Sequence, residues 1–421
     1  MEMKPGYKQT DVGVIPEDWS CAVIRDAAAS KPNAIVGGPF GSDLLSADYV
    51  AQGVPVVRGQ NMSGSTVSGD FVFVSKQKAK SLIANLACPK DLIFTQRGTL
   101  GQVAIVPGGE YQCYLVSQSQ MKVSLDETRH SPQFVRHYFS SSDGQRKIFD
   151  SAIQTGVPHT NLGILRSYQF PAPPILEQRA IATALSDMDA LLDGLDRLIA
   201  KKRAIKQAAM QQLLTGQTRL PGFSGEWEVK CLGGLADIRS GGTPGTGDAA
   251  AWDGEVPWCT PTDVTAVEGG KYLTTTNRTI TEHGLRNSSA ELIPARSILM
   301  TSRATIGECV INTVPMATNQ GFKNLVPFDF VDVDFLYYLL CTQKQGLVGL
   351  SSGSTFLEIG KVQVRQYEVR LPSTKNEQAA IAAILSDMDT EITALEARRT
   401  KTRDLKQAMM QELLTGRTRL V

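Results

Sequence analysis

A long segment of the chain occurs twice, and this internal repeat limits the folds that the sequence can adopt. Residues 177–220 return at residues 377–420, and both copies contain the runs LSDMD and LLTG at matching positions. The copies are 200 positions apart, which is close to half of the 421 residues. We therefore expect two related halves built on one plan.

Both copies have the apolar spacing of a long helix with one narrow stripe. In the first copy the stripe residues follow one another at intervals of four, three, four, three and four: Ile181, Leu185, Met188, Leu192, Leu195 and Ile199. The second copy keeps this register with Ile381, Leu385, Met388, Ile392 and Leu395. Such spacing predicts a coiled-coil interface. At 1.5 Å per residue each helix would be on the order of 55 Å long, which is the length of a spacer.

The charges predict how the two helices pair. Acidic residues occupy the front half of each segment and basic residues occupy the back half. Two such helices match opposite charges when they run antiparallel, and the same distribution complements each helix dipole. We therefore predict an antiparallel coiled coil within one chain. The alternative, in which each helix packs only on its own domain, stays open because Lys202 and Arg399 are polar residues late in the stripe.

Two globular blocks alternate with these helices. Short apolar runs between Gly, Pro, Asn and Asp residues predict strands, and Ser131 followed by Pro132 predicts the start of a helix. The expected fold is α/β, with mixed domains at residues 1–172 and 219–371 separated by helical segments at residues 173–218 and 372–421. Trp19 and Trp227 open the two blocks in similar contexts, so the N-terminus is expected to lie beside residues 417–420.

The second block repeats the landmarks of the first at lower identity. Residues 93–101 line up with residues 299–307, and residues 134–138 line up with residues 335–339. The pair Ser119 and Gln120 lines up with Asn319 and Gln320. Because the helices are nearly identical while the blocks differ, we expect the blocks to do related but different jobs.

Composition restricts the class of protein only loosely. The net charge of +1 neither indicates nor excludes a nucleic-acid partner. Seven scattered cysteines suggest reduced thiols in the cytoplasm and argue against a zinc site. No signal peptide is visible, and no apolar run approaches the 18 residues of a membrane span.

Enzyme motifs are missing from the sequence. The segment PAPPI at residues 171–175 lacks both the polar and the aromatic residue of an amino-methyltransferase motif, and no phosphate loop of a motor enzyme is present. The glycine-rich segment at residues 241–247 is expected to be a loop near a ligand or phosphate. The four histidines, His130, His137, His159 and His283, are expected at the surface or in loops. These observations predict a chain that does not catalyse a reaction and holds no metal or cofactor.

Groups of polar loop residues suggest DNA contacts instead. Arg pairs with guanine, Asn and Gln pair with adenine, and Lys binds phosphate. For any single residue, a solvated loop position or a turn anchor is as good an explanation, and only the repetition of the groups in both blocks favours DNA. The candidate residues are Phe40, Ser42, Arg58, Gln60, Asn61, Arg97, Thr99, Gln118, Gln120 and Lys122 in the first block, and Thr243, Thr262, Arg303, Thr305, Asn319, Gln320 and Lys323 in the second.

The order of these features resembles the specificity subunits of Type I restriction-modification systems. The resemblance covers the whole chain. It is carried by GPFGS at residues 38–42, by RGTLG at residues 97–101, by Glu177 and Gln178 at the start of a helix, and by LLTG with its C-terminal copy. The second block departs from the first at residues 242–244 and 302–304.

This resemblance implies two target-recognition domains joined by two long helices that the family shares. Each domain would read one half of a bipartite double-stranded DNA site. Methylation and cleavage would belong to two modification subunits and to restriction subunits, with S-adenosylmethionine on the modification subunits. Two other functions remain to be compared with this one, a self-contained methyltransferase or nuclease and a coiled-coil scaffold with no DNA role.

Overall fold

The computed structural model describes residues 5–154, 156–267, 270–303, 305–351 and 357–420. Contacts group the chain into two units, of which unit 1 is Met1–Leu195 with Arg398–Val421 and unit 2 is Asp196–Ala397. Each long helix contributes one half to each unit. The predicted domain boundaries at residues 172, 218 and 371 follow the sequence pattern and remain predictions.

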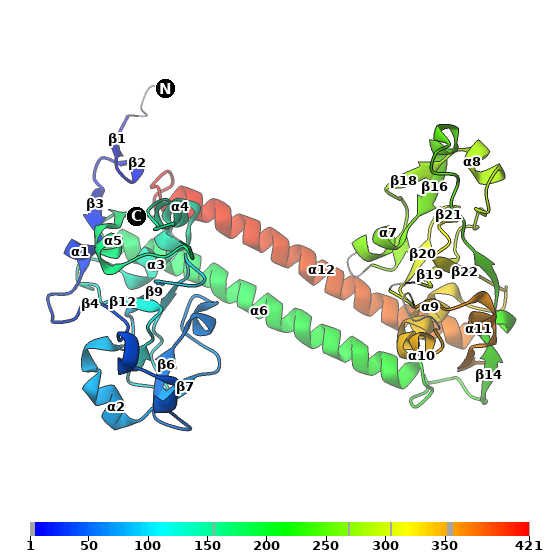
Figure 1. Cartoon of the computed structure of the whole chain (residues 1–421), viewed down its shortest axis with the longest axis horizontal. Coiled ribbons are helices and arrows are strands. Elements are labelled where there is room, and N and C mark those ends of the chain that lie inside the picture. Colours follow the sequence, from blue (N-terminus) through cyan, green and yellow to red (C-terminus); the bar gives the residue numbers. More distant parts are fainter. Residues whose placement is uncertain (1–4, 155, 268–269, 304, 352–356, 421) are drawn as a thin grey trace. The chain divides into compact units, whose positions relative to one another are not determined.

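The globular part of unit 1 mixes short strands and helices (Figure 1). Its helices are α1 (Ile24–Ala27), α2 (Lys76–Ser81), α3 (Pro132–Ser140), α4 (Ser142–Asp150) and α5 (Leu162–Ser167). Its strands are β1 (Tyr7–Thr10), β2 (Gly13–Pro16), β3 (Ser20–Val23), β4 (Ile35–Gly37), β5 (Tyr49–Val50), β6 (Val54–Val57), β7 (Val72–Val74), β8 (Leu86–Ala87), β9 (Leu92–Thr95), β10 (Val103–Ile105), β11 (Tyr114–Val116), β12 (Gln120–Val123) and β13 (Gln169–Ala172).

Unit 2 has the same kind of architecture. Its short helices are α7 (Pro261–Ala266), α8 (Glu282–Arg286), α9 (Val333–Thr342), α10 (Lys344–Gly349) and α11 (Lys361–Gln366). Its strands are β14 (Trp227–Cys231), β15 (Ala236–Ser240), β16 (Trp252–Cys259), β17 (Tyr272–Leu273), β18 (Arg278–Ile280), β19 (Ile298–Thr301), β20 (Cys309–Asn312), β21 (Ala317–Thr318), β22 (Phe322–Pro327) and β23 (Glu368–Pro372). The long helices are α6 (Ile175–Leu213) and α12 (Lys375–Leu413).

The two globular parts share one sheet topology. The sheet order β10-β9-β12-β4 of unit 1 returns in unit 2 as β20-β19-β22-β15, with β17 added at the edge. A parallel pair follows in both units, since β11 runs parallel to β6 and β21 runs parallel to β16. The expectation of two related mixed α/β domains is therefore confirmed.

Each long helix begins inside the core of its own globular part. Ile181 and Leu185 belong to the buried cluster of unit 1, together with Leu413 from the end of α12. Ile381 and Leu385 belong to the corresponding cluster of unit 2, together with Leu213 from the end of α6. In each unit the long helix therefore packs both on its own globular part and on the end of the other long helix, so the two alternatives from the sequence occur together.

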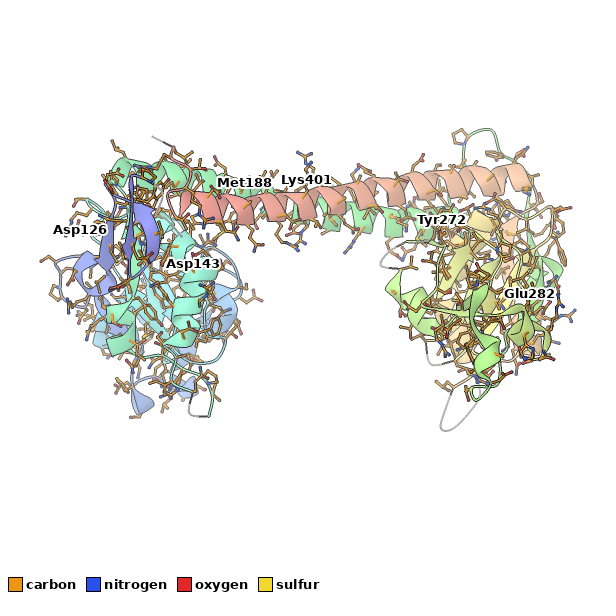
Figure 2. All side chains as sticks on the ribbon, turned by 90° about the horizontal axis from the view of Figure 1, so that it is seen from above. Asp126, Asp143, Met188, Tyr272, Glu282 and Lys401 are labelled. Atoms are coloured by element: carbon orange, nitrogen blue, oxygen red, sulfur yellow. The ribbon has the colours of Figure 1, made fainter. Side chains whose placement is uncertain are left out.

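The remaining stripe residues lie between these ends. Leu195, Ile199 and Ile392 are buried, and Met188, Leu192, Met388 and Leu395 are half-buried. Figure 2 labels Met188 on α6 and, in the same unit, Lys401 on α12. The predicted stripe is thus the covered face of each helix.

Ion pairs within each unit show that the helices are antiparallel. In unit 1 the Nζ of Lys406 on α12 lies 2.5 Å from Oδ1 of Asp189 on α6. In unit 2 Lys206 pairs with Asp389, and Lys202 lies 2.7 Å from Glu391. The acidic front of one helix therefore meets the basic back of the other, as the charge pattern predicts.

The end of α12 closes unit 1 onto the N-terminal segment. Gly416 has a φ of 69°, and a Cβ there would lie 2.5 Å from the ring of Pro16. Arg419 then reaches the buried carboxylate of Glu177 at 2.5 Å, and the indole of Trp19 donates to the same carboxylate at 3.0 Å. Within the described residues, the expected neighbourhood of the N-terminal segment and the segment after α12 is confirmed.

Unit 2 contains the matching closure. Arg219, which follows α6, lies 2.6 Å from the carboxylate of Glu377, whose side chain is 3% exposed. The indole of Trp227 donates to this carboxylate at 3.3 Å. The repeated run LLTG is therefore followed in both units by an arginine that neutralises a buried glutamate at the start of the other long helix.

One of the four histidines, His137, lies neither at the surface nor in a loop, whereas His130 lies in the loop before α3, as expected, but is buried there. His137 on α3 is 1% exposed, and His130 is 5% exposed beside the ring of Phe170. Burial, together with the charge of Arg136, lowers the pKa of His137 to about 3. His137 is therefore a neutral core residue whose Nε2 lies 3.1 Å from the hydroxyl of Ser186 on α6, and the expectation of a surface position was wrong.

No helix among the described residues is both long enough and apolar enough to cross a membrane.

Candidate nucleic-acid interface

The loop that follows β9 carries Arg97, and the loop that follows β19 carries Arg303. Both arginines are exposed. The backbone of Arg97 forms an isolated bridge with His159, and the backbone of Arg303 forms the same bridge with Glu358. These two segments, which precede α5 and α11, fix the loops in the same way in both units.

In unit 1 the turn before β12 lies against the loop that carries Arg97. In unit 2 the turn before β22 lies against the loop that carries Arg303. The amide of Gln96 donates to the carbonyl of Ser119 at 2.7 Å, and the amide of Ser302 donates to the carbonyl of Gly321 at 2.7 Å. Ser119 therefore corresponds to Gly321, which makes Gln118 the equivalent of Gln320. The sequence alignment of Gln120 with Gln320 was out of register by two residues.

A glycine-rich segment packs against each turn. A Cβ on Gly38 would lie 1.9 Å from the carbonyl oxygen of Ser117, and one on Gly241 would lie 2.0 Å from that of Asn319. Only glycine allows this approach. Two residues further on, Phe40 is 85% exposed in unit 1, and Thr243 donates its hydroxyl to Gln320 in unit 2.

In unit 1 these parts form a hollow of about 450 Å³. Gln118 donates to the carbonyl of Gly41 at 2.7 Å, which joins the turn to the glycine-rich segment. The hollow is lined by three of the predicted residues, Phe40, Arg97 and Gln118, and by Gln96 and Asn161. It offers guanidinium, amide and aromatic groups, which are the groups that bind bases and phosphates.

A third pair of loops follows β6 in unit 1 and β16 in unit 2, the strands that run parallel to β11 and β21 respectively. In unit 1 the Oδ1 of Asn61 accepts from the amide of Arg58 at 3.1 Å, and in unit 2 the Oδ2 of Asp263 accepts from the amide of Thr260 at 2.7 Å. These contacts make Gln60 the equivalent of Thr262, and both are exposed. The same kind of capping contact therefore places Gln60 in unit 1 and Thr262 in unit 2.

Four of the candidate residues are buried and serve the fold. Asn61 is 1% exposed and donates to the carbonyls of Ser68 and Asp70. Gln120 is 1% exposed and accepts from Ser117. Lys122 is 6% exposed and donates to the carbonyl of Leu86. Lys323 is 5% exposed, and these four side chains are not available to a duplex on the surface of their unit.

The other candidates are accessible to different degrees. Ser42, Thr99 and Thr305 are exposed, whereas Arg58 and Asn319 are half-buried. The side-chain Oδ1 of Asn319 accepts from the amide of Gly321 at 2.9 Å, so this oxygen is occupied within the turn. The exposed set that remains is Phe40, Ser42, Gln60, Arg97, Thr99 and Gln118 in unit 1, and Thr262, Arg303, Thr305 and Gln320 in unit 2 with the half-buried Thr243 beside them.

His159 and Glu358 belong to the site and were not among the candidates for DNA contact. A signal for them exists in the sequence, because Arg166 and Tyr168 return as Arg365 and Tyr367 at the same distance behind them. That signal is short and weak, so strand pairing was needed to recognise it. Among the described residues, no group of three His, Cys, Asp or Glu side chains could hold a metal ion.

The comparisons with known proteins agree with this arrangement. The model of the Type I restriction modification DNA specificity domain matches the chain twice, over residues 46–204 and 224–402. The chain belongs to this family. The two matches fall one on each globular block and the first part of its following helix, so each half of this specificity-family chain carries one match to the domain.

Curated relatives carry related names. The putative Type I restriction enzyme MjaX specificity subunit of Methanocaldococcus jannaschii is 23% identical over 98% of this chain and 97% of its own length. The MjaIX specificity subunit of the same organism is 38% identical, but the match spans only 39% of this chain and 38% of that subunit. The Escherichia coli EcoR124I/EcoR124II specificity subunit is 25% identical over 65% of this chain and 67% of its own.

A solved structure has the same fold. The S subunit of a Type I restriction-modification system from M. genitalium matches with a TM-score of 0.60 at 16% identity, and the match covers 98% of this chain and 99% of that one. At this identity the likeness concerns the fold alone. It agrees with two repeated α/β domains and two long helices in a specificity-family chain.

Proposed function

We propose that this chain is the DNA-specificity subunit of a Type I restriction-modification complex. The globular part of each unit reads one half of a bipartite, asymmetric site in double-stranded DNA. The observation that carries this proposal is the repeated site, in which both units expose an arginine at the equivalent position, Arg97 or Arg303, and differ in the side chains of the neighbouring loops. Phe40 and Gln60 in unit 1 correspond to the half-buried Thr243 and the exposed Thr262 in unit 2.

The proposed chemistry is recognition without catalysis by this chain. Methylation belongs to two modification subunits, which hold S-adenosylmethionine, and cleavage belongs to restriction subunits. The outer faces of α6 and α12 are the proposed docking surface for the modification subunits, and the place of action is the cytoplasm. No feature of the described residues favours a self-contained methyltransferase or nuclease, or a scaffold without a DNA role.

Replacing Arg97 with alanine is expected to relax one position of the first half-site. A bidentate contact from arginine to guanine contributes about 1–3 kcal/mol of discrimination, so the preference at that position should fall by roughly 5- to 150-fold. Sequencing of methylated sites in the host genome, with the wild-type or the variant chain, measures the change. The second half-site should be unaffected.

The matched control is Arg25→Ala, which removes another exposed arginine of unit 1, one that pairs with Asp26 at 2.8 Å. It should leave both half-sites unchanged. A loss of methylation that is equal on all sequences in the Arg97→Ala variant would make Arg97 a phosphate contact and would contradict its assignment as a base reader.

We also propose that the long helices set the gap between the two half-sites. Inserting four helical residues after Leu214 adds about 6 Å, which corresponds to roughly two base pairs of duplex at 3.4 Å each. The expected result is a longer unspecified gap with both half-sites unchanged. The same genome-wide map of methylated sites reads it out, and altered half-sites would contradict the role of the helices as a spacer.

A further inference from the structure

The segment that pairs with the arginine loop differs in one charged residue between the two units. His159 and Glu358 occupy equivalent positions, because the following amides of Thr160 and Ile359 donate to the carbonyls of Gln96 and Ser302, both at 3.0 Å. Each residue also bridges the backbone of the loop arginine. The backbone frame is therefore shared, and the side chains next to the arginine are not.

In unit 2 the carboxylate of Glu358 lies between two cations. Its Oε2 is 2.9 Å from Nε of Arg303, and its Oε1 is 3.6 Å from Nζ of Lys323. The Lys323 side chain is only 7% exposed, and its Nζ also lies 3.3 Å from the hydroxyl of Ser302. Burial lowers the pKa of Lys323, and Glu358 opposes that shift. The buried lysine thus holds the carboxylate, and the carboxylate holds the exposed arginine.

Unit 1 has neither part of this arrangement. In the strand register, Phe322 pairs with Thr301 as Gln120 pairs with Thr95, so the position of Lys323 is taken by Met121, which is completely buried. The position of Glu358 is taken by His159. Among the described residues, no carboxylate forms an ion pair with Arg97.

We infer that Glu358 is a positioning residue for specificity, which fixes the Arg303 side chain so that its free N–H groups face one base pair of the second half-site. This inference rests on the proposed function. An arginine side chain has many rotamers, and its planar fork reads guanine well when its orientation is already set. With Nε beside Glu358, the terminal nitrogens of Arg303 stay available. Arg97 lacks this support.

The ion pair acts on orientation and has little effect on folding. The side chains of Arg303 and Glu358 are 45% and 36% exposed, and ion pairs this accessible contribute little to stability because water screens them. Replacing Glu358 with glutamine keeps the size of the side chain and the backbone bridge, and the glutamine oxygen and the Ser302 hydroxyl can still accept from the buried Lys323, so the variant should fold. What changes is the charge that holds the guanidinium.

The test uses the full-length chain, co-expressed with its modification subunits, and a library of random duplexes from which bound DNA is sequenced. The Glu358→Gln variant should lose roughly 10-fold of its preference at one base pair of the second half-site, with the first half-site and total DNA binding unchanged. Lys323→Met, which introduces the residue found at the equivalent position of unit 1, should reduce the base preference at the same base pair. Glu228→Gln is the matched control, because it removes another accessible carboxylate of unit 2, one that pairs with Lys230 at 2.7 Å, and it should leave both half-sites as they are.

Three results would overturn the inference. In the first, Glu358→Gln keeps full discrimination. In the second, it selects a different base with undiminished strength, so that Glu358 itself reads the base. In the third, binding falls equally on all sequences. If the wild-type chain selects no sequence at all, the proposed function fails, whereas a wild-type bipartite site with an unaffected variant refutes only the role of Glu358.

Discussion

Replacing Arg419 with alanine is expected to destabilise unit 1 by about 3 kcal/mol, because it leaves a buried carboxylate without its cation. The side chain of Glu177 is 0% exposed, while that of Arg419 is 33% exposed, so we take the lower end of the range for broken buried pairs. Arg419 also lies 2.8 Å from Asp18. Amide hydrogen exchange, which reports the two units separately, should show faster exchange in the core of unit 1.

Arg417→Ala provides the matched control in the same segment. Arg417 lies 3.8 Å from Glu412, and both side chains are accessible, so its loss should change stability by less than about 0.5 kcal/mol. Arg219→Ala should instead destabilise unit 2, where Arg219 neutralises Glu377, and leave unit 1 unchanged. Unchanged protection of unit 1 in Arg419→Ala would show that Trp19 alone is a sufficient partner for Glu177.

Replacing Leu195 with aspartate is expected to unfold the middle of the helix pair. Leu195 is 5% exposed, and aspartate is too short to bring its charge to water. Lost apolar burial and a buried charge together cost on the order of 3–5 kcal/mol. Loss of the helical circular dichroism signal at a lower temperature than in the wild type measures the effect.

Leu191→Asp is the control on the same helix, since Leu191 is 40% exposed. It lies outside the apolar stripe, so its replacement should cost less than about 1 kcal/mol. Equal effects at the two positions would contradict the assignment of the stripe as the covered face. An intact helix signal in Leu195→Asp, combined with weaker binding of modification subunits, would make Leu195 a docking residue.

Much of the frame could be predicted because it depends on local patterns. The stripe from Ile181 to Ile199 follows from helix periodicity, and the antiparallel pairing follows from charges that Lys406 and Asp189 bring together. The helix after Ser131 could be predicted from its cap, which accepts from the amide of Phe134. Each of these features needs only a few neighbouring residues to be recognised.

The candidate site could be predicted only in part, because its members meet through strand pairing. Gln118 rather than Gln120 corresponds to Gln320, since the connections between the paired strands differ in length: Thr95 and Gln120 are 25 positions apart, whereas Thr301 and Phe322 are 21 apart. Polarity also gave no indication that Asn61 is a cap or that Lys122 is buried. Both side chains satisfy the backbone within their own unit, and only packing reveals this.

The sequence by itself determined that this chain is a duplicated structure of two α/β domains and two antiparallel helices, because repeats, periodicity and charge order are properties of the chain in one dimension. The tertiary structure decided which polar residues remain accessible and which of them are neighbours. It also showed that Glu358 and Lys323 accompany Arg303 while Arg97 has His159 beside it. Those contacts join residues that are dozens of positions apart, and hydrogen bonds between strands fix which of them meet.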